Sequence, residues 1–340
     1  MGRRLCETMA GLEFYVSSRY ADQAGPACTR FEPTELRALL TSTWQKYDGF
    51  ILIMATGIVV RMIAPLLQSK ETDPAVVVMD DAGRFAISLL SGHLGGGNEL
   101  AGRCAYASGA CAVVTTATDA NDLPSFDMLA KEQGWVIDDI SRIKTLNTLL
   151  LDYEEIAVVD ATGRTRLWLG GRGRITFHET LADAADSQAR GFLCVTSRIL
   201  PEQVNPGQLL ILRPRTLVLG IGCNRGTPLE EINEFVTYHL QQQGLSRKSI
   251  CCIATVAAKR DETGLVDFAV LLGVPLRCFE SDELNRVSFP SPPSEHALAA
   301  VGAAGVAEPA AILASGGGKL LLNKVKSANV TLAVAELAGA

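Results

Sequence analysis

ISLLSGHLGGGNEL, residues 87–100, joins an apolar run to a helix start through a turn that contains three consecutive glycines. The apolar run stops at Ser91, Gly92 and His93, and the chain restarts at Asn98, a pattern typical of a strand, a tight turn and a helix. Consecutive glycines indicate a backbone with positive φ or a neighbour that lies close against it. The stretch therefore predicts an α/β fold whose glycine-rich loop is a site rather than a connector.

The composition narrows the class of protein. The 340 residues are 48% hydrophobic and 20% charged, and the net charge is −6. An acidic chain that lacks lysine and arginine runs is not expected to bind nucleic acid. Glu7 and Glu13 interrupt what would be a signal-peptide core. The run 297–307, which is almost all alanine, glycine and valine, is too short and too weakly apolar to span a bilayer. We therefore expect a cytoplasmic protein without a membrane partner.

Cysteine and histidine spacing predicts no metal site. The nine cysteines form no C-x-x-C pair, and Cys251 and Cys252 are adjacent, so we expect reduced thiols rather than bridges. A zinc motif of the H-E-x-x-H type is also missing, because Ala182 stands where the second histidine would follow His178 and Glu179.

Three modules are predicted along the chain. The first is an α/β module with a doubly wound sheet, the second a small α+β domain, and the third another α/β module. Their bounds are residues 1–118, 119–214 and 215–340. In the second module, the runs 156–159 and 165–169 flank Thr162 and Gly163 and predict a hairpin.

Local patterns predict the elements beside the candidate loops. The apolar runs 75–79 and 84–90 flank a turn that ends at Gly83, which predicts a hairpin in the first module. In the third module, Thr227 and Glu230 form a predicted capping box, in which the Glu230 side chain folds back onto the amide of Thr227.

Four loops lie where a strand is expected to lead into a helix, which is where α/β sheets bind ligands. They are residues 55–61, 91–99, 220–227 and 315–319. Neither nucleotide motif is complete, because Gly226 comes one residue late for G-x-G-x-x-G and Leu313 replaces the first glycine of a P-loop. Free amides at a helix start bind anions, so residues 97–98 predict a cradle for a carboxylate or an oxyanion.

Side chains in these loops allow more than one interpretation. His93 is either a hydrogen-bonded turn residue or a general base that Glu99 or Asp80 orients, because its pKa lies near neutrality. Arg61 is either a surface charge or a group that binds a substrate carboxylate. Cys223 is expected to have a structural role, because no obvious base lies near it in the sequence, although the nearby helix start would lower the pKa of its thiol.

Two residues of the third module also have open roles. Glu308 is a lone acid in an apolar run, and such an acid is either capped by backbone amides or functional. Lys319 follows three glycines and is the C-terminal counterpart of Arg61.

Six strings, together with the tail 330–335 of the C-terminal module, resemble the CbiG family, the cobalt-precorrin-5A hydrolases of the anaerobic cobalamin pathway. They are ATGIVVR (55–61), KETDPAVVVMD (70–80) and LLSGHLGGGNELA (89–101) for the family's N-terminal module, and VLGIGCNRGTPLEEI (218–232), KRDETGL (259–265) and VAEPAAILASGGGKLLLNK (306–324) for its C-terminal module. The resemblance covers both ends of the chain in the family's order, and the middle region carries little of it.

The resemblance implies hydrolysis of the ring-A δ-lactone of cobalt-precorrin-5A, with release of acetaldehyde to give cobalt-precorrin-5B. We predict that His93 activates the water, that Asn98 and the amides of residues 95–97 stabilise the oxyanion, and that His93 or Glu99 deprotonates the hydroxyl. The alternative is a non-catalytic tetrapyrrole-binding or carrier protein of the same pathway. The predicted substrate-binding residues are Thr56, Gly57, Arg61, Ser91, Gly92, Gly95, Gly96, Gly97, Gly222, Cys223, Arg225, Gly226, Thr227, Glu308, Ser315, Gly316, Gly317 and Lys319.

The resemblance implies no separate cofactor, because the cobalt arrives within the substrate. A cobalt-containing tetrapyrrole is therefore the expected small-molecule partner. A homodimer and transient contact with neighbouring pathway enzymes stay open as further hypotheses.

Overall fold

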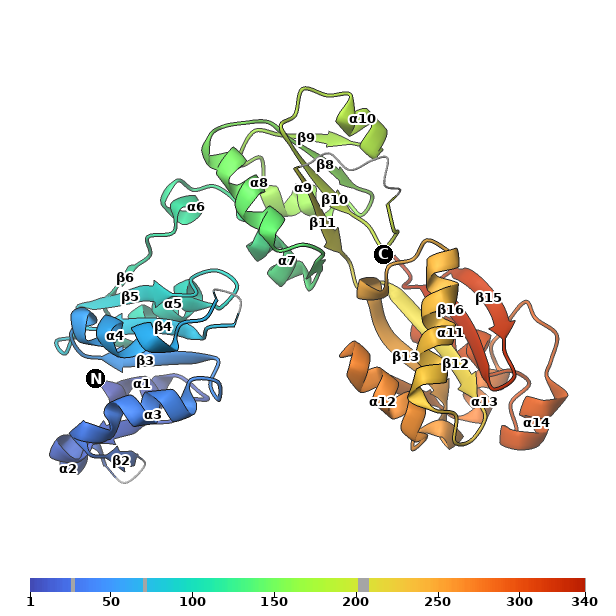
Figure 1. Cartoon of the computed structure of the whole chain (residues 1–340), viewed down its shortest axis with the longest axis horizontal. Coiled ribbons are helices and arrows are strands. Elements are labelled where there is room, and N and C mark those ends of the chain that lie inside the picture. Colours follow the sequence, from blue (N-terminus) through green and yellow to red (C-terminus); the bar gives the residue numbers. More distant parts are fainter. Residues whose placement is uncertain (26–27, 70–71, 201–207, 340) are drawn as a thin grey trace. The chain divides into compact units, whose positions relative to one another are not determined.

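Figure 1 shows a computed structural model of the chain, which describes residues 1–25, 28–69, 72–200 and 208–339. The chain divides into two compact units, Met1–Met128 and Leu129–Ala340, and each is described by itself. The first unit contains one four-stranded sheet and a small two-stranded one, and the second unit contains two five-stranded sheets. Helices accompany each large sheet, so the predicted α/β fold class is confirmed.

The large sheet of the first unit carries the loop quoted at the outset. Its strands, in sheet order, are β3 (Gly49–Ile53), β4 (Ala75–Met79), β5 (Phe85–Leu90) and β6 (Cys111–Val113). β4 and β5 pair antiparallel, which confirms the predicted hairpin, and Gly83 in its turn has a φ of +67°. β5 and β6 pair parallel. The carboxyl ends of β5 and β6 therefore meet at one edge of the sheet.

Helices cover both faces of this sheet, as the sequence predicted for a doubly wound module. The alternation of side chains along β4 sends Val77 and Met79 into the core beneath α1 (Gly2–Thr8) and α5 (Gly97–Ser108). Val76 and Val78 face the opposite core, beneath α3 (Leu36–Thr43) and α4 (Thr56–Ile63). All five residues of β4 are buried, which explains their unbroken apolar run.

The remaining elements of the first unit lie around this sheet. β1 (Tyr15–Ser17) and β2 (Thr29–Phe31) pair parallel in a separate two-stranded sheet. Lys70 and Glu71, which begin one of the family strings, lie outside the described residues. The other elements are the 3-10 helices η1 (Ser18–Tyr20), η2 (Pro33–Glu35) and η3 (Ala64–Leu66), and the helices α2 (Ala21–Ala24), α6 (Ala117–Ala120) and α7 (Phe126–Gln133), the last of which begins in this unit.

The middle module contains a mainly parallel sheet. Its strands, in sheet order, are β7 (Val136–Ile137), β11 (Leu209–Arg213), β10 (Gly191–Val195), β8 (Ile156–Asp160) and β9 (Ile175–His178). Only β7 runs antiparallel to its neighbour among these described strands. The helices α8 (Ser141–Leu151), α9 (Arg164–Leu169) and α10 (Leu181–Ala185) alternate with the strands. This alternation is α/β, in place of the α+β arrangement predicted for the middle module.

The hairpin predicted around Thr162 and Gly163 is wrong, because the chain enters α9 after that turn. The carboxylate of Asp160 accepts from the amide of Thr162 at 2.9 Å and from the amide of Thr165 at 2.8 Å. Gly163 has a φ of +70°, which lets the backbone turn into the helix. Asp160 thus ends β8 and starts α9, and β8 pairs parallel with β9.

The C-terminal module is a mixed sheet built around β12. In sheet order its strands are β14 (Leu276–Phe279), β13 (Ile250–Val256), β12 (Leu217–Cys223), β16 (Val330–Glu336) and β15 (Leu320–Lys326). β16 runs antiparallel to both of its neighbours. The late strand β16 therefore lies inside the sheet, beside β12.

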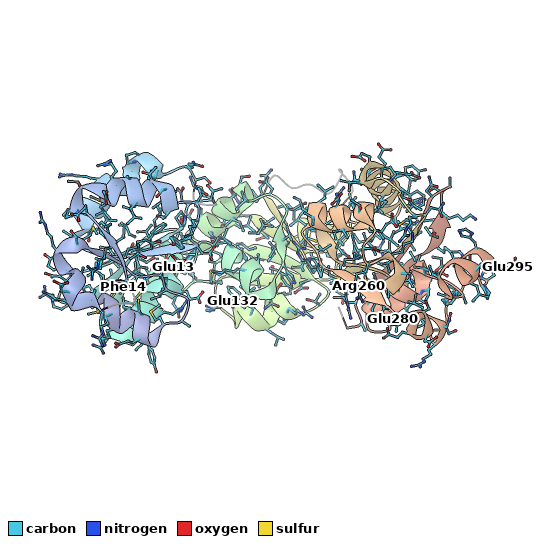
Figure 2. The ribbon with its side chains drawn as sticks, turned by 90° about the horizontal axis from the view of Figure 1, so that it is seen from below. Glu13, Phe14, Glu132, Arg260, Glu280 and Glu295 are labelled. Carbon is cyan, nitrogen blue, oxygen red and sulfur yellow. The ribbon has the colours of Figure 1, made fainter. Side chains whose placement is uncertain are left out.

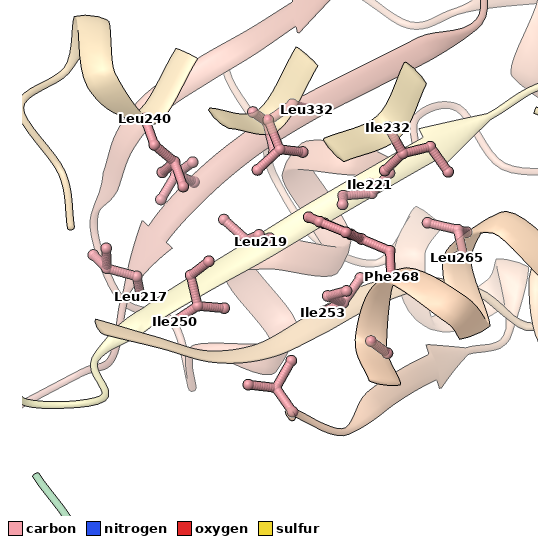
Figure 3. Close-up of a cluster of buried hydrophobic side chains, with 14 of the residues drawn as sticks. Leu217, Leu219, Ile221, Ile232, Leu240, Ile250, Ile253, Leu265, Phe268 and Leu332 are labelled. Atoms are coloured by element: carbon pink, nitrogen blue, oxygen red, sulfur yellow. The ribbon is translucent and has the colours of Figure 1, made fainter. Parts of the chain in front are cut away.

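One face of this sheet is covered by α11 (Leu229–Gln242) and α12 (Thr263–Leu272), as Figure 3 shows for their buried side chains. Leu219 and Ile221 of β12 pack there with Ile232 of α11 and Phe268 of α12. The other face packs against α15 (Ala307–Ala314). A Cβ on Gly220 would overlap the carbonyl of Ala307, so only glycine lets α15 approach β12 this closely.

The other elements of the C-terminal module are short. They are η5 (Arg247–Ser249), η6 (Ala257–Lys259), α13 (Ser281–Asn285) and α14 (Glu295–Val301). Charged side chains such as Glu132, Arg260 and Glu280 are exposed on the surface of the second unit (Figure 2). None of the helices within the described residues is long and apolar enough to cross a membrane.

Candidate functional site

The glycine-rich turn after β5 folds back on its own backbone. The amide of Gly96 donates to the carbonyl of His93, and the amide of Gly97 donates to the carbonyl of Ser91, each at 2.9 Å. Gly96 has a φ of +85°, and a Cβ on Gly97 would lie 2.5 Å from the carbonyl oxygen of Leu90. The glycines are therefore needed for the packing of the turn itself.

The prediction that backbone amides of residues 95–98 bind an anion or an oxyanion is wrong for three of these amides. The amides of Gly96 and Gly97 already have backbone acceptors, and the amide of Asn98 donates to the carbonyl of Gly92 at 2.9 Å. A Cβ on Gly95 would overlap the side chain of Ser91, so this glycine also serves internal packing. The chemistry of the turn consequently depends on side chains.

His93 lies between two carboxylates. Its side chain is 16% exposed, its Nε2 is 2.7 Å from Oδ2 of Asp119, and its Nδ1 is 3.3 Å from Oδ2 of Asp127. The hydroxyl of Thr118 lies 3.3 Å from Nε2, and the hydroxyl of Ser125 lies 3.3 Å from Nδ1. Both ring nitrogens thus have polar partners, and we call these five residues the His93 cluster.

Asp119 is the more exposed carboxylate, with 47% of its side chain open to solvent. The side-chain amide of Asn98 donates to Oδ2 of Asp119 at 3.0 Å and to the hydroxyl of Thr116 at 3.1 Å, and that hydroxyl donates to the same Oδ2. Ser88 donates to the amide oxygen of Asn98 at 2.7 Å. Three donors, including His93, therefore hold one oxygen of Asp119 in place.

The pKa values of the cluster favour an imidazolium between two carboxylates. Burial raises the pKa of Asp127, but hydrogen bonds from His93 and Ser125 outweigh it and lower that pKa to about 2. The hydrogen bond to Asp127 raises the pKa of His93 against the effect of burial, and Asp119 raises it further. Burial also raises the pKa of Asp119, and donation from Thr116 and His93 lowers it overall.

The sheet brings these residues together from separate parts of the sequence. His93 follows β5, and Asp119 follows β6, whose carboxyl ends share one edge. The sequence interpretation missed Asp119, Asp127 and Ser125. The signal that could have found Asp119 is the polar run after β6, because a strand end beside a candidate loop is itself a candidate position.

Asp80 and Glu99 were the predicted partners of His93. Asp80 instead accepts from the amides of Arg84 and Phe85, each at 2.8 Å, and so stabilises the hairpin turn. Glu99 is exposed in the first turn of α5, while the carboxylates that contact the imidazole belong to Asp119 and Asp127.

The other predicted binding residues of the first unit lie near strand ends. Thr56 and Gly57 begin α4 directly after β3, and Arg61 is exposed one turn later. The hydroxyl of Ser91 donates to the carbonyl of Asp73 at 2.9 Å, which ties the turn to the chain before β4.

The loop after β12 is capped by a carboxylate of its own module. Oε1 of Glu262 accepts from the amide of Gly226 at 2.5 Å, and Oε2 accepts from Lys259 Nζ at 3.1 Å. Glu262 is 6% exposed. The amide of Gly226, which was predicted to bind a substrate carboxylate, thus donates to a carboxylate of the protein itself. Arg225, beside it, is exposed.

The predicted capping box at the start of α11 is wrong. The hydroxyl of Thr227 donates to the carbonyl of Asn224 at 2.8 Å. Helix α11 begins at Leu229 with Pro228 as its N-cap, and within the described residues no side chain caps it. Glu230 is exposed. Thr227 therefore stabilises the preceding turn rather than the helix.

Gly222 and Cys223 end β12, and the thiol of Cys223 is half-buried. Burial raises the pKa of Cys223 to about 11, against the effect of nearby Lys259. The prediction that the helix start lowers this pKa is therefore wrong, because loss of solvent dominates.

Glu308 is 1% exposed and holds neighbouring segments together. Its Oε1 accepts from the hydroxyl of Ser291 at 2.9 Å and from the amide of Lys324 at 3.0 Å. Of the two interpretations of Glu308, these contacts favour a carboxylate capped by backbone and hydroxyl donors, with a structural role.

The loop 315–319 ends α15 instead of starting a helix. The amide of Gly316 donates to the carbonyl of Leu313, the amide of Gly317 donates to the carbonyl of Ile312, and the hydroxyl of Ser315 accepts from the amide of Gly318. A helix C-terminus carries a partial negative charge, so this backbone is unsuited to anions. Lys319 is exposed at the end of this loop.

Comparison with known proteins assigns the family. Models described as "Cobalamin synthesis G N-terminal", "Cobalamin biosynthesis central region" and "Cobalamin synthesis G C-terminus" match residues 38–119, 124–214 and 217–335. A cobalt-precorrin-5A hydrolase from Priestia megaterium is 39% identical over 88% of this chain and 81% of that protein. The chain belongs to the CbiG family.

A second curated relative agrees with this assignment. A cobalt-precorrin-5A hydrolase from Salmonella typhimurium is 34% identical over 84% of this chain and 81% of that protein. The solved structure of a cobalamin biosynthesis protein G homologue from Sulfolobus solfataricus is 23% identical, covers 95% of this chain and 96% of that chain, and has a TM-score of 0.35. The family resemblance drawn from the six strings is confirmed.

The His93 cluster spans two of the CbiG family models. His93 and Asp119 lie within the N-terminal match, and Ser125 and Asp127 lie within the central match. Among the described residues, no group of three or more histidine, cysteine, aspartate or glutamate side chains is arranged to hold a metal ion.

Proposed function

We propose that this chain hydrolyses cobalt-precorrin-5A, opening its ring-A δ-lactone and releasing acetaldehyde to give cobalt-precorrin-5B. The observation that carries the proposal is the 39% and 34% identity, over most of the chain, to two proteins named cobalt-precorrin-5A hydrolase. The hydrolase names disfavour the alternative of a non-catalytic carrier.

The chemistry of the His93 cluster supports this reaction. Opening a lactone requires a group that takes a proton from water and a preorganised environment for the charge that develops. Asp119 offers a half-exposed carboxylate, and His93 offers a charge-paired imidazole beside it.

The substrate proposal extends to binding groups and partners. A tetrapyrrole fringed with acetate and propionate groups needs cations, and Arg61, Arg225 and Lys319 are each exposed within their own module. Cobalt enters as part of the substrate, and the proposal includes no separate cofactor. We extend the proposal to a cytoplasmic location, a homodimer and transient contacts with neighbouring pathway enzymes.

The decisive experiment incubates the purified chain with cobalt-precorrin-5A without oxygen. Acetaldehyde is measured by coupling to alcohol dehydrogenase and NADH, and the macrocycle is followed by its absorbance. A hydrolase releases one aldehyde per macrocycle converted. A carrier changes the absorbance without aldehyde, and that result would overturn the proposal.

A variant pair locates the reaction. His93→Ala is expected to lower turnover by about 100-fold or more, because it removes the imidazole that contacts both Asp119 and Asp127 in the cluster. His296→Gln, at an exposed position on α14, is the matched control and is expected to keep normal turnover. Normal turnover by His93→Ala would remove the cluster from the mechanism.

A further inference from the structure

The members of the His93 cluster differ in their access to solvent. The side chain of Asp119 is 47% exposed, while those of His93 and Asp127 are 16% and 9% exposed. Each ring nitrogen of His93 lies within 3.3 Å of a carboxylate oxygen. A general base must reach the proton that it removes, and this geometry gives the better access to Asp119.

The donors around Asp119 leave a defined role for its second oxygen. His93, Asn98 and Thr116 all bond to Oδ2. Among the described residues, none of these three bonds involves Oδ1 of Asp119. The side chain that carries this oxygen is nearly half open to solvent. One oxygen thus holds the carboxylate in place while the other is available to a water molecule.

We propose, resting on the proposed function, that Asp119 is the catalytic base of lactone opening and that His93 and Asp127 are positioning residues that act through it. This assignment reverses the roles expected from the sequence, where His93 was the base and an acid oriented it.

The proposed step balances without a further reactant. Oδ1 of Asp119 accepts a proton from water as the water oxygen bonds to the lactone carbonyl carbon, and the carbonyl electron pair moves to its oxygen. That pair then re-forms the carbonyl as the ring C–O bond breaks, and the departing alkoxide takes the proton from Asp119. His93 keeps both ring protons throughout, and the sum is lactone plus water giving a carboxylic acid and an alcohol.

Charge explains why the imidazole would stay protonated. The charged groups that act on His93, among the described residues, are Asp127 of α7 and Asp119 of α6, and both raise its pKa. The protonated cluster carries one net negative charge, from two carboxylates and one imidazolium. Deprotonation of His93 would leave two negative charges beside an anionic transition state, which disfavours the reaction.

The sign of the pH dependence separates the two assignments. If Asp119 is the base, turnover falls as the pH rises through the raised pKa of His93, because the imidazolium is lost. If neutral His93 is the base, turnover rises over the same range. The measurement is acetaldehyde release against pH, together with the pKa of His93 from NMR titration of 13C-labelled histidine. His93→Gln assigns the resonance among the four histidines.

Two variants test the positioning role of Asp127 and the catalytic role of Asp119. Asp127→Asn removes one carboxylate, so the pKa of His93 and the high-pH limb of turnover should both move to lower pH, a change that a merely structural role would not cause. Asp119→Asn should lower kcat about 1000-fold with little change in KM. Asp22→Asn, at an exposed position on α2, is the control.

The outcomes keep the two proposals distinguishable. If the wild-type chain releases no acetaldehyde at any pH, the proposed function fails. If the wild type turns over but its rate rises through the pKa of His93, or Asp119→Asn retains normal kcat while folded by circular dichroism, the assignment of Asp119 fails and the function stands.

Discussion

The turn after β5 and the turn after β12 look alike in sequence but differ in what they present. Both follow a strand, contain glycine and lead into a helix. In the first, the amides of Gly96 and Gly97 bond to carbonyls of the same turn, and a partly exposed set of side chains remains. In the second, the buried carboxylate of Glu262 accepts a hydrogen bond from the amide of Gly226. A glycine-rich turn binds anions only where its amides lack acceptors within the protein.

The largest effect is expected from Gly97→Ala. The added Cβ would lie 2.5 Å from the carbonyl oxygen of Leu90 and 3.0 Å from Oγ of Ser88, so the turn must move. We expect a loss of about 3 kcal/mol in the free energy of unfolding, typical of overpacking, and loss of acetaldehyde release. Urea unfolding and the turnover assay measure both.

Gly102→Ala, in the same helix, is the matched control because a Cβ there meets nothing within 4 Å. It should be neutral or slightly stabilising, since alanine favours a helix over glycine. If Gly97→Ala were as stable and active as Gly102→Ala, close packing would not be the reason for glycine in the first turn.

Glu262→Gln tests the second turn and should have a smaller effect. The change weakens the bond to the amide of Gly226 and removes the ionic partner of Lys259. We expect a loss of about 2 kcal/mol in the free energy of unfolding, the range for hydrogen bonds to charged groups. Glu230→Gln, which is exposed, serves as the control. Equal stability of the two variants would contradict the capping role of Glu262.

The same variant pair has a predicted pH dependence. Burial raises the pKa of Glu262, but the amide of Gly226 and Lys259 lower it below its usual value. A lowered folded-state pKa contributes stability that is present above the unfolded pKa and is lost as pH falls through the folded pKa. The difference in stability between wild type and Glu262→Gln should therefore shrink in acid, as measured by urea unfolding from neutral pH downward.

The smallest effect is expected at Cys223. Burial raises the pKa of its thiol to about 11, so only about one molecule in a thousand is a thiolate at pH 8. Iodoacetamide followed by mass spectrometry should label the exposed Cys111 well before Cys223. Cys223→Ser should keep normal turnover. Rapid labelling of Cys223 would show that the second turn is more open than its burial indicates.

The strands of the two end modules were predictable because their signal is local. The runs that became β4 and β12 are apolar without a break, since each strand is covered on both faces. The middle hairpin was mispredicted because one carboxylate, Asp160, redirects the chain into α9. The alternation of hydrophobic residues does not encode that bond.

The site was predictable only in part, for a related reason. His93 and Asn98 belong to a conspicuous local string; His93 is the centre of the cluster, and Asn98 donates to its Asp119. Asp119 and Asp127 reach them only through the parallel pairing of β5 and β6 and the path that follows. Likewise, Glu262 lies at the start of α12 and Gly226 lies just before α11, so the fold must bring these two helix starts together for the carboxylate to accept from the amide. Such partners are set by the tertiary fold and leave no spacing rule in the sequence.

The position of β16 bears on how the C-terminal sheet is made. This strand lies between β12 and β15, although it is the last described strand in chain order. During synthesis, domains generally fold as units once their residues have emerged from the ribosome. Until residues 330–336 emerge, β12 has an open edge, so a nascent chain that stalls just before them would expose that edge to chaperones or to other nascent chains.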